Sequence, residues 1–294
     1  MKEQKKGFTI VEITLAMTFL AILLVAIATL IMRITNIYQK GLAMRGINAT
    51  GTEIIDDMTR TISSASYLVD IHSQDASMGG NGILTYDNNY SLVDKYYYAY
   101  TKFNEENYKG AGVHVQYYGV LCTGNYSYIW NTARALDENR TSSDFVLVND
   151  KKVKLVRVYD RSQKQCDPTY NPSPGDLDKS SLMYQVASGR RPIKISLAEE
   201  DVVEIINEDE LDLALYEFNV TPATQSAVTR QSFISANFIL ATRQGGININ
   251  ANGDHCRGEN NEFRDEYDSS MFNYCAVNKF TFSARTGGNS NKEG

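Results

Sequence analysis

The fold is decided by the stretch at residues 5–33, KKGFTIVEITLAMTFLAILLVAIATLIMR. Residues 13–32 carry no charge and include neither proline nor glycine. A helix of about twenty residues spans about 30 Å, which is the thickness of the hydrocarbon core of a bilayer. Glu12 lies directly before this run, although a carboxylate costs about 2.5–3.5 kcal/mol at the centre of a membrane helix and is usually paired. The stretch therefore predicts a membrane helix and raises the question of what Glu12 pairs with.

Three interpretations of this segment are open. As a secretory signal, it would use the N-terminal lysines as its basic region and Ala26-Ile27-Ala28 as its cleavage site. Its apolar run, however, exceeds the usual length of about 7–15 residues. The second interpretation, a plain single-pass anchor, explains the hydrophobicity of the segment but not the presence of Glu12. The third interpretation rests on the residues around Glu12.

The string GFTIVE at residues 7–12 resembles the class III signal of type IV pilins and type II secretion pseudopilins. This resemblance implies a short basic leader that includes Lys5 and Lys6. It also implies cleavage between Gly7 and Phe8 by a membrane prepilin peptidase, followed by methylation of the new N-terminal residue, Phe8.

The same resemblance offers Glu12 a partner. Glu12 would become the fifth residue of the mature chain, and in the family this glutamate pairs with the N-terminal amine of a neighbouring subunit. Opposite charges are tolerated together where each alone is costly, so Glu12 is expected to set the register of filament assembly. The resemblance is close over residues 1–35, looser over 36–65, and limited to the overall plan in the rest of the chain.

The helical spacing of apolar residues continues after this run, at Ile34, Ile37, Tyr38, Leu42, Ile55, Met58 and Ile62. It predicts one helix over about residues 8–65, membrane-spanning at 8–33 and amphipathic at 34–65. Three glycines lie within residues 41–51, and each costs about 1 kcal/mol relative to alanine in a helix interior. We therefore expect a kink or a frayed turn there.

From residue 66 onward, short apolar and aromatic runs separated by turn residues predict strands. These runs are 83–87, 95–103, 113–122, 126–130, 145–148, 153–160, 182–187, 193–197, 213–220, 232–241 and 278–285. We expect a leader at 1–7, one β-rich globular head at 66–286 and a flexible tail at 287–294. The predicted fold class is α+β, a long N-terminal helix packed on a mainly antiparallel sheet, which is also the pilin plan. The size of the head favours a minor, low-copy subunit.

Four cysteines, Cys122, Cys166, Cys256 and Cys275, lie outside the apolar segment, and none shows the C-x-x-C spacing of zinc or redox motifs. Their even count favours two disulfides formed in an oxidising compartment. Three connectivities are open. We favour Cys122–Cys166 with Cys256–Cys275, because each bridge would staple a polar, loop-rich stretch, and four free thiols are the alternative.

Charge and motifs argue against catalysis and against nucleic-acid binding. The chain has 29 basic and 35 acidic residues and a net charge of −6, which disfavours a bulk electrostatic grip on phosphates. The basic residues within 151–157 and the acidic pair Asp56-Asp57 are interpreted as solvated surface. The sequence contains no phosphate loop, dinucleotide fingerprint or nucleophile elbow. We therefore expect neither an enzyme nor a cofactor.

Two further patterns have ordinary structural interpretations. Tyr96, Tyr98 and Tyr100 would share one strand face, as is common for tyrosine in sheets, although such a strip could also bind glycans. Residues 248–259, NINANGDHCRGE, match the spacing of a calcium loop but lack its leading aspartate. A turn beside a disulfide is favoured, and no metal is predicted.

Together with these features, the resemblance implies a minor pilin or pseudopilin in a bacterial cytoplasmic membrane, with one membrane span and the head outside the cytoplasm. The protein would reach the cell surface in a type IV pilus or a type II secretion-like filament, near its tip. Expected partners are other pilin subunits, prepilin peptidase, the inner-membrane assembly platform and membrane lipid. Two alternatives are an adhesin head at the pilus tip, and a membrane-anchored binding protein unrelated to filaments.

Overall fold

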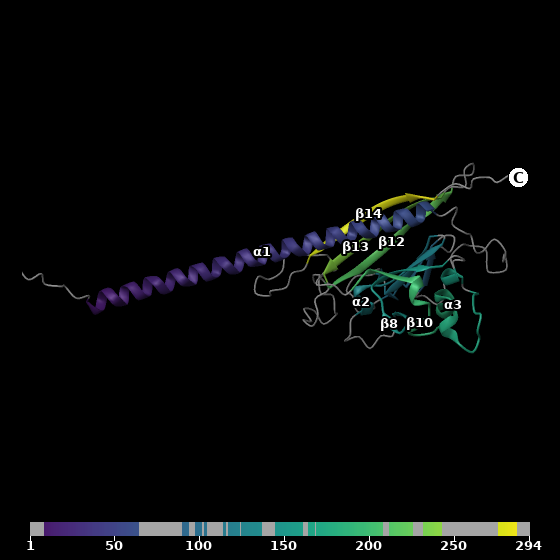
Figure 1. Cartoon of the computed structure of the whole chain (residues 1–294), viewed down its shortest axis with the longest axis horizontal. Coiled ribbons are helices and arrows are strands. Elements are labelled where there is room, and N and C mark those ends of the chain that lie inside the picture. The colour runs from purple at the N-terminus through teal and green to yellow at the C-terminus, as the bar shows by residue number, and fades with distance from the viewer. Residues whose placement is uncertain are drawn as a thin grey trace, which may run out of the picture.

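The computed structural model describes a long helix and a large part of the head. The described residues are 9–64, 90–93, 98–101, 103–104, 114–115, 117–123, 125–136, 145–160, 164–167, 169–207, 212–225, 232–242 and 276–286. Helix α1 (Ile10–Ser64) projects far beyond the head, which covers only its C-terminal part (Figure 1). The predicted leader, the predicted tail and the strand expected at 83–87 lie outside the described residues.

Helix α1 is unbroken over 55 residues. From residue 43 onward it buries one face, formed by Ala43, Ile47, Ile54, Met58 and Ile62. The kink expected at 41–51 is wrong, because the helix passes through this segment without interruption. A Cβ atom at Gly51 would lie 2.2 Å from Cζ of Phe280. Gly51 therefore lets the helix approach the sheet closely.

The head is built on a six-stranded antiparallel sheet with strand order β1-β2-β5-β6-β9-β11. Its strands are β1 (Tyr90–Val93), β2 (Tyr98–Thr101), β5 (Tyr118–Cys122), β6 (Tyr126–Asn131), β9 (Leu155–Tyr159) and β11 (Val202–Ile206). The runs at 95–103, 113–122, 126–130 and 153–160 predicted four of these strands. Strands β1 and β11 were not predicted.

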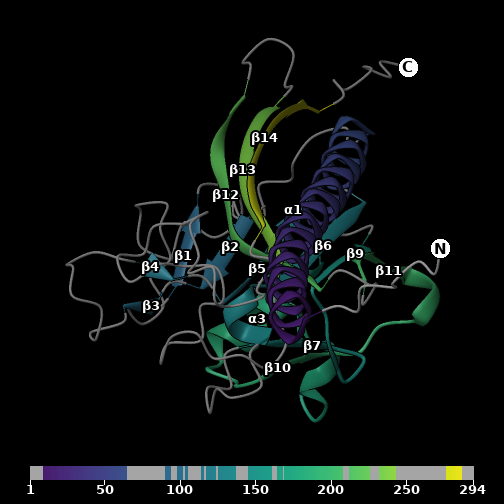
Figure 2. The same ribbon diagram turned by 90° about the vertical axis from the view of Figure 1, so that its left-hand side faces the viewer.

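Smaller sheets and short helices complete the described head. A three-stranded antiparallel sheet, β12 (Leu213–Gln225), β13 (Ser232–Thr242) and β14 (Val277–Arg285), lies against α1 (Figure 2). Strand β7 (Val146–Val148) pairs in parallel with β10 (Ile193–Ile195) and antiparallel with β8 (Lys151–Lys152). The remaining elements are β3 (Phe103–Asn104), β4 (His114–Val115), α2 (Ala133–Leu136), α3 (Leu182–Ala187) and the 3₁₀ turns η1 (Lys164–Cys166), η2 (Leu177–Lys179) and η3 (Glu199–Asp201).

Two large hydrophobic cores use opposite faces of the six-stranded sheet, because side chains alternate along a strand. In the first core, Trp130 packs against Phe218 and Phe218 against Phe238, with ring centroids 4.7 and 5.8 Å apart. This core joins the sheet to α1 and to β12–β14. The second core contains Ile129 of the same strand β6, together with Ile193 of β10 and residues of β7 and α3. The predicted α+β class is confirmed.

Residues 182–187 form helix α3, so the strand expected there is wrong. Ser181 caps this helix, because its hydroxyl accepts a hydrogen bond of 2.8 Å from the backbone N–H of Tyr184. Gly189 follows the helix with φ of 74°, a conformation that favours glycine after a helix end. Periodicity could not separate helix from strand in so short an apolar run.

Candidate functional site

The first candidate site is the N-terminal end of α1, where Glu12 closes a hydrogen-bonded ring with Thr9. Oε2 of Glu12 accepts bonds from the backbone N–H of Thr9, at 2.9 Å, and from its hydroxyl, at 3.0 Å. In return, the N–H of Glu12 donates to the Thr9 hydroxyl oxygen at 3.3 Å. This reciprocal arrangement is a capping box, which satisfies two backbone donors at the helix start.

The capping box leaves one half of the carboxylate available. All its bonds fall on Oε2 of Glu12, and no described residue bonds to Oε1. Both residues are exposed. Glu12 can therefore stabilise its own helix and still present an oxygen to a cation from another molecule. Lys5, Lys6, Gly7 and Phe8, the other residues of the predicted signal, lie outside the described residues.

The apolar surface of α1 begins next to this cap. Every described side chain between Ile10 and Gln39 is exposed, and the helix is long and apolar enough to cross a membrane. The threonines on this surface bond to backbone carbonyls one turn earlier: Thr14 to Val11, Thr18 to Thr14, Thr29 to Ala26 and Thr35 to Ile31. These hydroxyls are satisfied within the helix, as a lipid or protein interior requires.

The second candidate site anchors the other half of α1 to the head. Asp57, whose side chain is 8% exposed, forms ion pairs with Arg157 of β9 and with Arg60 of the same helix. The hydroxyl of Tyr128, on β6, donates to Asp57 Oδ2 at 2.8 Å and lies 2.8 Å from the hydroxyl oxygen of Thr61. Burial, reinforced by the charge of Asp57, raises the pKa of the Tyr128 hydroxyl. We call these five residues the Asp57 anchor.

The Asp57 anchor and the separate ion pair of Lys154 correct the interpretation of these charges as solvated surface. Lys154, whose side chain is 9% exposed, forms an ion pair of 2.7 Å with Asp212 and also bonds to the carbonyl of Asn207. Lys151 and Lys152 are exposed, as expected. These charged residues look alike in sequence, but some are buried in ion pairs and others are exposed. The difference depends on the face of the sheet to which each side chain points and on partners distant in sequence.

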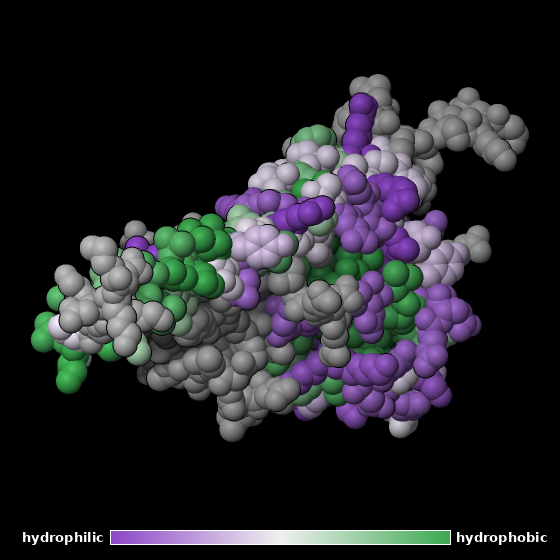
Figure 3. All heavy atoms as spheres, turned by 60° about the vertical axis from the view of Figure 1, so that its left-hand side comes forward, coloured by the Kyte–Doolittle hydropathy of each residue, from purple (hydrophilic) through white to green (hydrophobic). Residues whose placement is uncertain are grey.

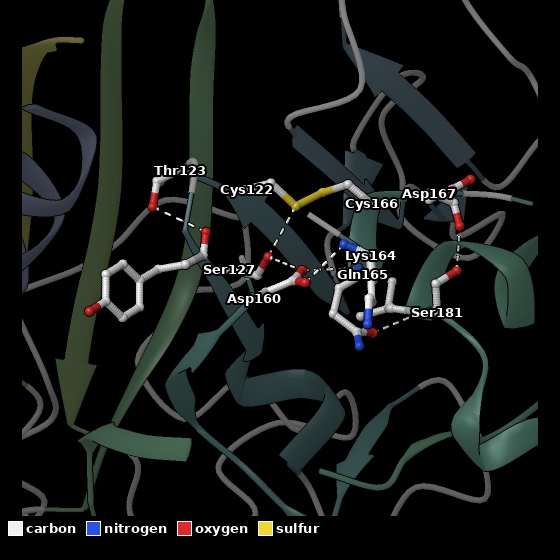
Figure 4. The surroundings of a disulfide bond; sticks show 11 residues. Cys122, Thr123, Ser127, Asp160, Lys164, Gln165, Cys166, Asp167 and Ser181 are labelled. Atoms are coloured by element: carbon white, nitrogen blue, oxygen red, sulfur yellow. Dashed lines mark hydrogen bonds between the residues drawn. A yellow bond between two sulfur atoms is a disulfide. The ribbon is translucent and has the colours of Figure 1, made fainter. Parts of the chain in front are cut away.

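Cys122 and Cys166, one of the two favoured cysteine pairs, are joined by a disulfide with their Cα atoms 6.6 Å apart. Asp160, buried beside the bridge, accepts hydrogen bonds from the Ser127 hydroxyl at 2.8 Å and from the backbone N–H groups of Lys164 and Gln165 (Figure 4). Asp160 thus ties turn η1 to β6 next to the bridge. Cys256 and Cys275 lie outside the described residues.

Within the part of the chain that the structure describes, no cluster of histidine, cysteine and acidic side chains has the makings of a metal site. The calcium-like segment 248–259 lies outside that part, as do Tyr96 and Tyr97. The functional residues that the sequence analysis missed are Thr9 and the partners of Asp57. Thr9 could have been found, because T-x-x-E is the sequence signature of a capping box.

No family model matches this chain, and neither a curated protein nor a solved structure is significantly similar to it.

Proposed function

We propose that the chain is a minor subunit of a type IV pilus or of a type II secretion-like filament. It would be inserted in the bacterial cytoplasmic membrane through the first half of α1, with its head outside the cytoplasm. Prepilin peptidase would cut between Gly7 and Phe8 and methylate Phe8. The subunit would then leave the membrane through an assembly platform and pack into the filament, near its tip, through the same helix surface.

The observation that carries this proposal is the division of α1 into two halves with opposite environments. The part of α1 between Ile13 and Met32 is uncharged and exposes apolar side chains all round, whereas the part from Ala43 to Ile62 is docked on two sheets. A free apolar helix that begins after Glu12 suits both lipid and a bundle of similar helices from other subunits. The rigid continuation of α1 would transmit the position of the helix to the head.

Glu12 would be the charge that sets the register between subunits. Its Oε1, which no described residue of its own chain uses, would accept a bond from the N-terminal amine of a neighbour. In an apolar environment neither the Glu12 carboxylate nor the amine is hydrated, so each charge would be stabilised by the other. A wrong register would leave both charges unpaired, so the correct register would be strongly favoured.

Variants of Glu12 test this role, provided that the helix cap is separated from the charge. In Glu12→Gln the side-chain carbonyl still accepts from the N–H of Thr9, so the capping box survives and only the negative charge is lost. In Thr9→Val the charge survives and the hydroxyl part of the cap is lost, at a cost of about 0.5–2 kcal/mol to the helix end. The measurement is the fraction of membrane-inserted subunit that is recovered in sheared filaments.

We expect Glu12→Gln and Glu12→Ala to insert in the membrane normally. The fraction of subunit recovered in filaments should fall by about tenfold or more, because loss of a hydrogen bond between charged groups weakens association by at least about that factor. Thr9→Val should enter filaments at nearly the normal level. Equal effects of Glu12→Gln and Thr9→Val would mean that Glu12 serves only its own helix. Normal filament entry of both Glu12 variants would favour a membrane-anchored binding protein instead.

A further inference from the structure

The part of α1 between its uncharged apolar run and the head is a short neck, which we define as residues 33–42. It follows the run 13–32 directly, and Ala43 is the first described side chain of the helix that is buried. Helix α1 continues through the neck without a break, so the neck stands at a fixed height above the run. Figure 3 shows the hydrophobic surface of the protruding helix giving way to hydrophilic residues where α1 approaches the head.

The charges in and around the neck have one sign. Three charged residues lie between Glu12 and Glu53, and all three are basic, although the whole chain has a net charge of −6. They are Arg33, Lys40 and Arg45. The side chain of Arg33 is exposed and has no counter-ion or hydrogen-bond partner in the part of the chain that the structure describes.

Two of these cations, Arg33 and Lys40, fall at the height of the lipid headgroups. With residues 13–32 in the hydrocarbon core, Arg33 lies at its boundary and Lys40 about 10 Å further out, two helical turns later and on the same side of α1. The headgroup layer is about 5–8 Å thick on each side of a bilayer. Side chains of a helix lean toward its N-terminus, which directs the Lys40 ammonium back to this layer.

The uncharged side chains of the neck suit the same layer. Ile34, Ile37 and Tyr38 are 58%, 74% and 66% exposed. Tyrosine is enriched at the membrane–water interface because its ring is apolar and its hydroxyl is polar. Lysine and arginine bury their aliphatic parts against apolar groups while their charged ends stay in a polar environment. Lipid can therefore cover the apolar side chains of the neck without desolvating its cations.

We propose that the neck of α1 binds the headgroups of anionic phospholipids, with the Arg33 guanidinium and the Lys40 ammonium on the lipid phosphates. This occupant fits both the position of the neck next to the apolar run and its excess of positive charge. The contact sets the height of the head above the bilayer, because one unbroken helix joins the neck to the head. The inference rests on the proposed insertion of α1 in a membrane and does not depend on the filament role.

Spin-labelled lipids measure this contact in vesicles that contain the full-length protein. The vesicles consist of phosphatidylcholine with a trace of spin-labelled phosphatidylglycerol or, for comparison, of spin-labelled phosphatidylcholine. Electron spin resonance gives the fraction of each labelled lipid that is held at the protein, and hence the preference for the anionic lipid over the zwitterionic one. Flotation of the same vesicles reports insertion separately.

Two matched double variants separate the neck from other basic residues. The neck variant is Arg33→Gln/Lys40→Gln. The control variant is Arg45→Gln/Lys279→Gln, which also removes one arginine and one lysine, both exposed. Arg45 is about 18 Å above Arg33 along α1. Lys279 adjoins a residue that bonds to Asn48 of α1, so it lies at a similar height or above.

We expect the unaltered protein to prefer phosphatidylglycerol about fivefold or more, since one cation near an anionic headgroup contributes about that factor. In the neck variant this preference should fall about threefold or more, whereas the control variant should keep it within about 1.5-fold. Both variants should float with the vesicles. Salt at about 1 M should weaken the preference, because it screens charges separated by more than about 3 Å.

Three results would overturn the proposal while leaving membrane insertion intact. They are no preference for phosphatidylglycerol in the unaltered protein, an undiminished preference in the neck variant, and equal losses in the two variants. An undiminished preference would mean that the neck cations face another protein instead of lipid. Failure of the unaltered protein to float would overturn the proposed insertion and, with it, this inference.

Discussion

At the scale of single residues, the carboxylate of Asp57 holds α1 on the central sheet because donors from two strands reach it. Tyr128 belongs to β6 and Arg157 to β9, so one side chain of the helix ties down two neighbouring strands. A buried carboxylate is stable only where charge and hydrogen bonds replace the water it has lost. Removing either donor would therefore cost more than the bond itself, because the other groups stay buried.

We predict that Tyr128→Phe lowers the free energy of unfolding by about 1–3 kcal/mol at neutral pH, because Asp57 and Thr61 lose their buried partner. The variant should also be less sensitive to alkali. The pKa of Tyr128 is raised in the folded protein, whereas an unfolded tyrosine loses its proton near pH 10. Above about pH 10 deprotonation of this tyrosine stabilises the unfolded state relative to the folded state. The contribution of the protonated hydroxyl to the free energy of unfolding is therefore lost progressively as the pH rises further.

Urea unfolding of the full-length protein in micelles, at pH 7 and at pH 11, measures both effects. The difference in the free energy of unfolding between the two pH values should be smaller for Tyr128→Phe than for the unaltered protein. The same pH dependence in both proteins would contradict the assignment of Tyr128 as a hydroxyl that stays protonated in the fold.

Sequence singles out Glu12 as a candidate site residue and gives no sign of the Asp57 anchor. Glu12 belongs to a local pattern, in which Thr9, Glu12 and the apolar run are neighbours along the chain. The bonds of Asp57 to Tyr128 and Arg157 join residues 71 and 100 positions apart. Helical spacing places Asp57 at the border of the buried face of α1, next to Ile54 and Met58, and Asp56 on the opposite side. The partners of Asp57, however, are given only by the packing of α1 over β6 and β9.

At the scale of elements, α1 could be predicted nearly to its ends. The expected range was 8–65 and the structure has Ile10–Ser64, because apolar spacing and the lack of proline mark a helix throughout. The interruption expected at 41–51 was wrong for a reason that sequence does not contain. The glycine at position 51 is required by a ring more than two hundred residues away, at Phe280.

Two glycine-to-alanine variants in α1 should have opposite effects. Gly51→Ala places a Cβ atom 2.2 Å from the ring of Phe280, which stacks on Phe238 at 5.1 Å, so the ring must leave this position. We expect it to destabilise the head by about 1–3 kcal/mol. Gly41→Ala has no atom within 4 Å of its Cβ and should stabilise the helix by up to about 1 kcal/mol.

Thermal unfolding followed by the near-ultraviolet signal of the head measures the pair of variants, since both change the same residue type on the same helix. Equal shifts of the midpoint would mean that glycine acts only through helix propensity. Restoration of stability in Gly51→Ala/Phe280→Leu, where the ring is replaced by a smaller side chain, would identify the contact as the cause.

The elements of the head were predicted less evenly than α1. Long alternating runs such as 278–285 became strands, because alternation over eight residues has few other interpretations. The short run 182–187 became helix α3. The hydroxyl of Ser181 caps the start of this helix, and Gly189 follows its end with a positive φ. Strand β11 was missed because its sequence DVVEII follows an acidic turn and lacks alternation.

At the scale of the whole molecule, the structure combines a closed head with an open helix. Among the described residues of the head, strands of the central sheet bury side chains on both of its faces. The first half of α1, in contrast, leaves many large apolar side chains exposed. An exposed apolar surface of this size is typical of a segment that is covered by lipid or by another protein. Fold class and the antiparallel sheet could be predicted, whereas strand order could not, because pairing joins segments distant in sequence.

The central claim, that this open helix is the processed N-terminus of a filament subunit, is tested most directly by intact and N-terminal mass spectrometry of the protein taken from its native membrane. The account predicts a chain that begins at Phe8, with Gly7 and the preceding residues removed, and that carries one added methyl group on its N-terminal amine. A chain that begins at Met1, or one cut near Thr29, would contradict the claim and leave the head as an anchored or secreted binding domain.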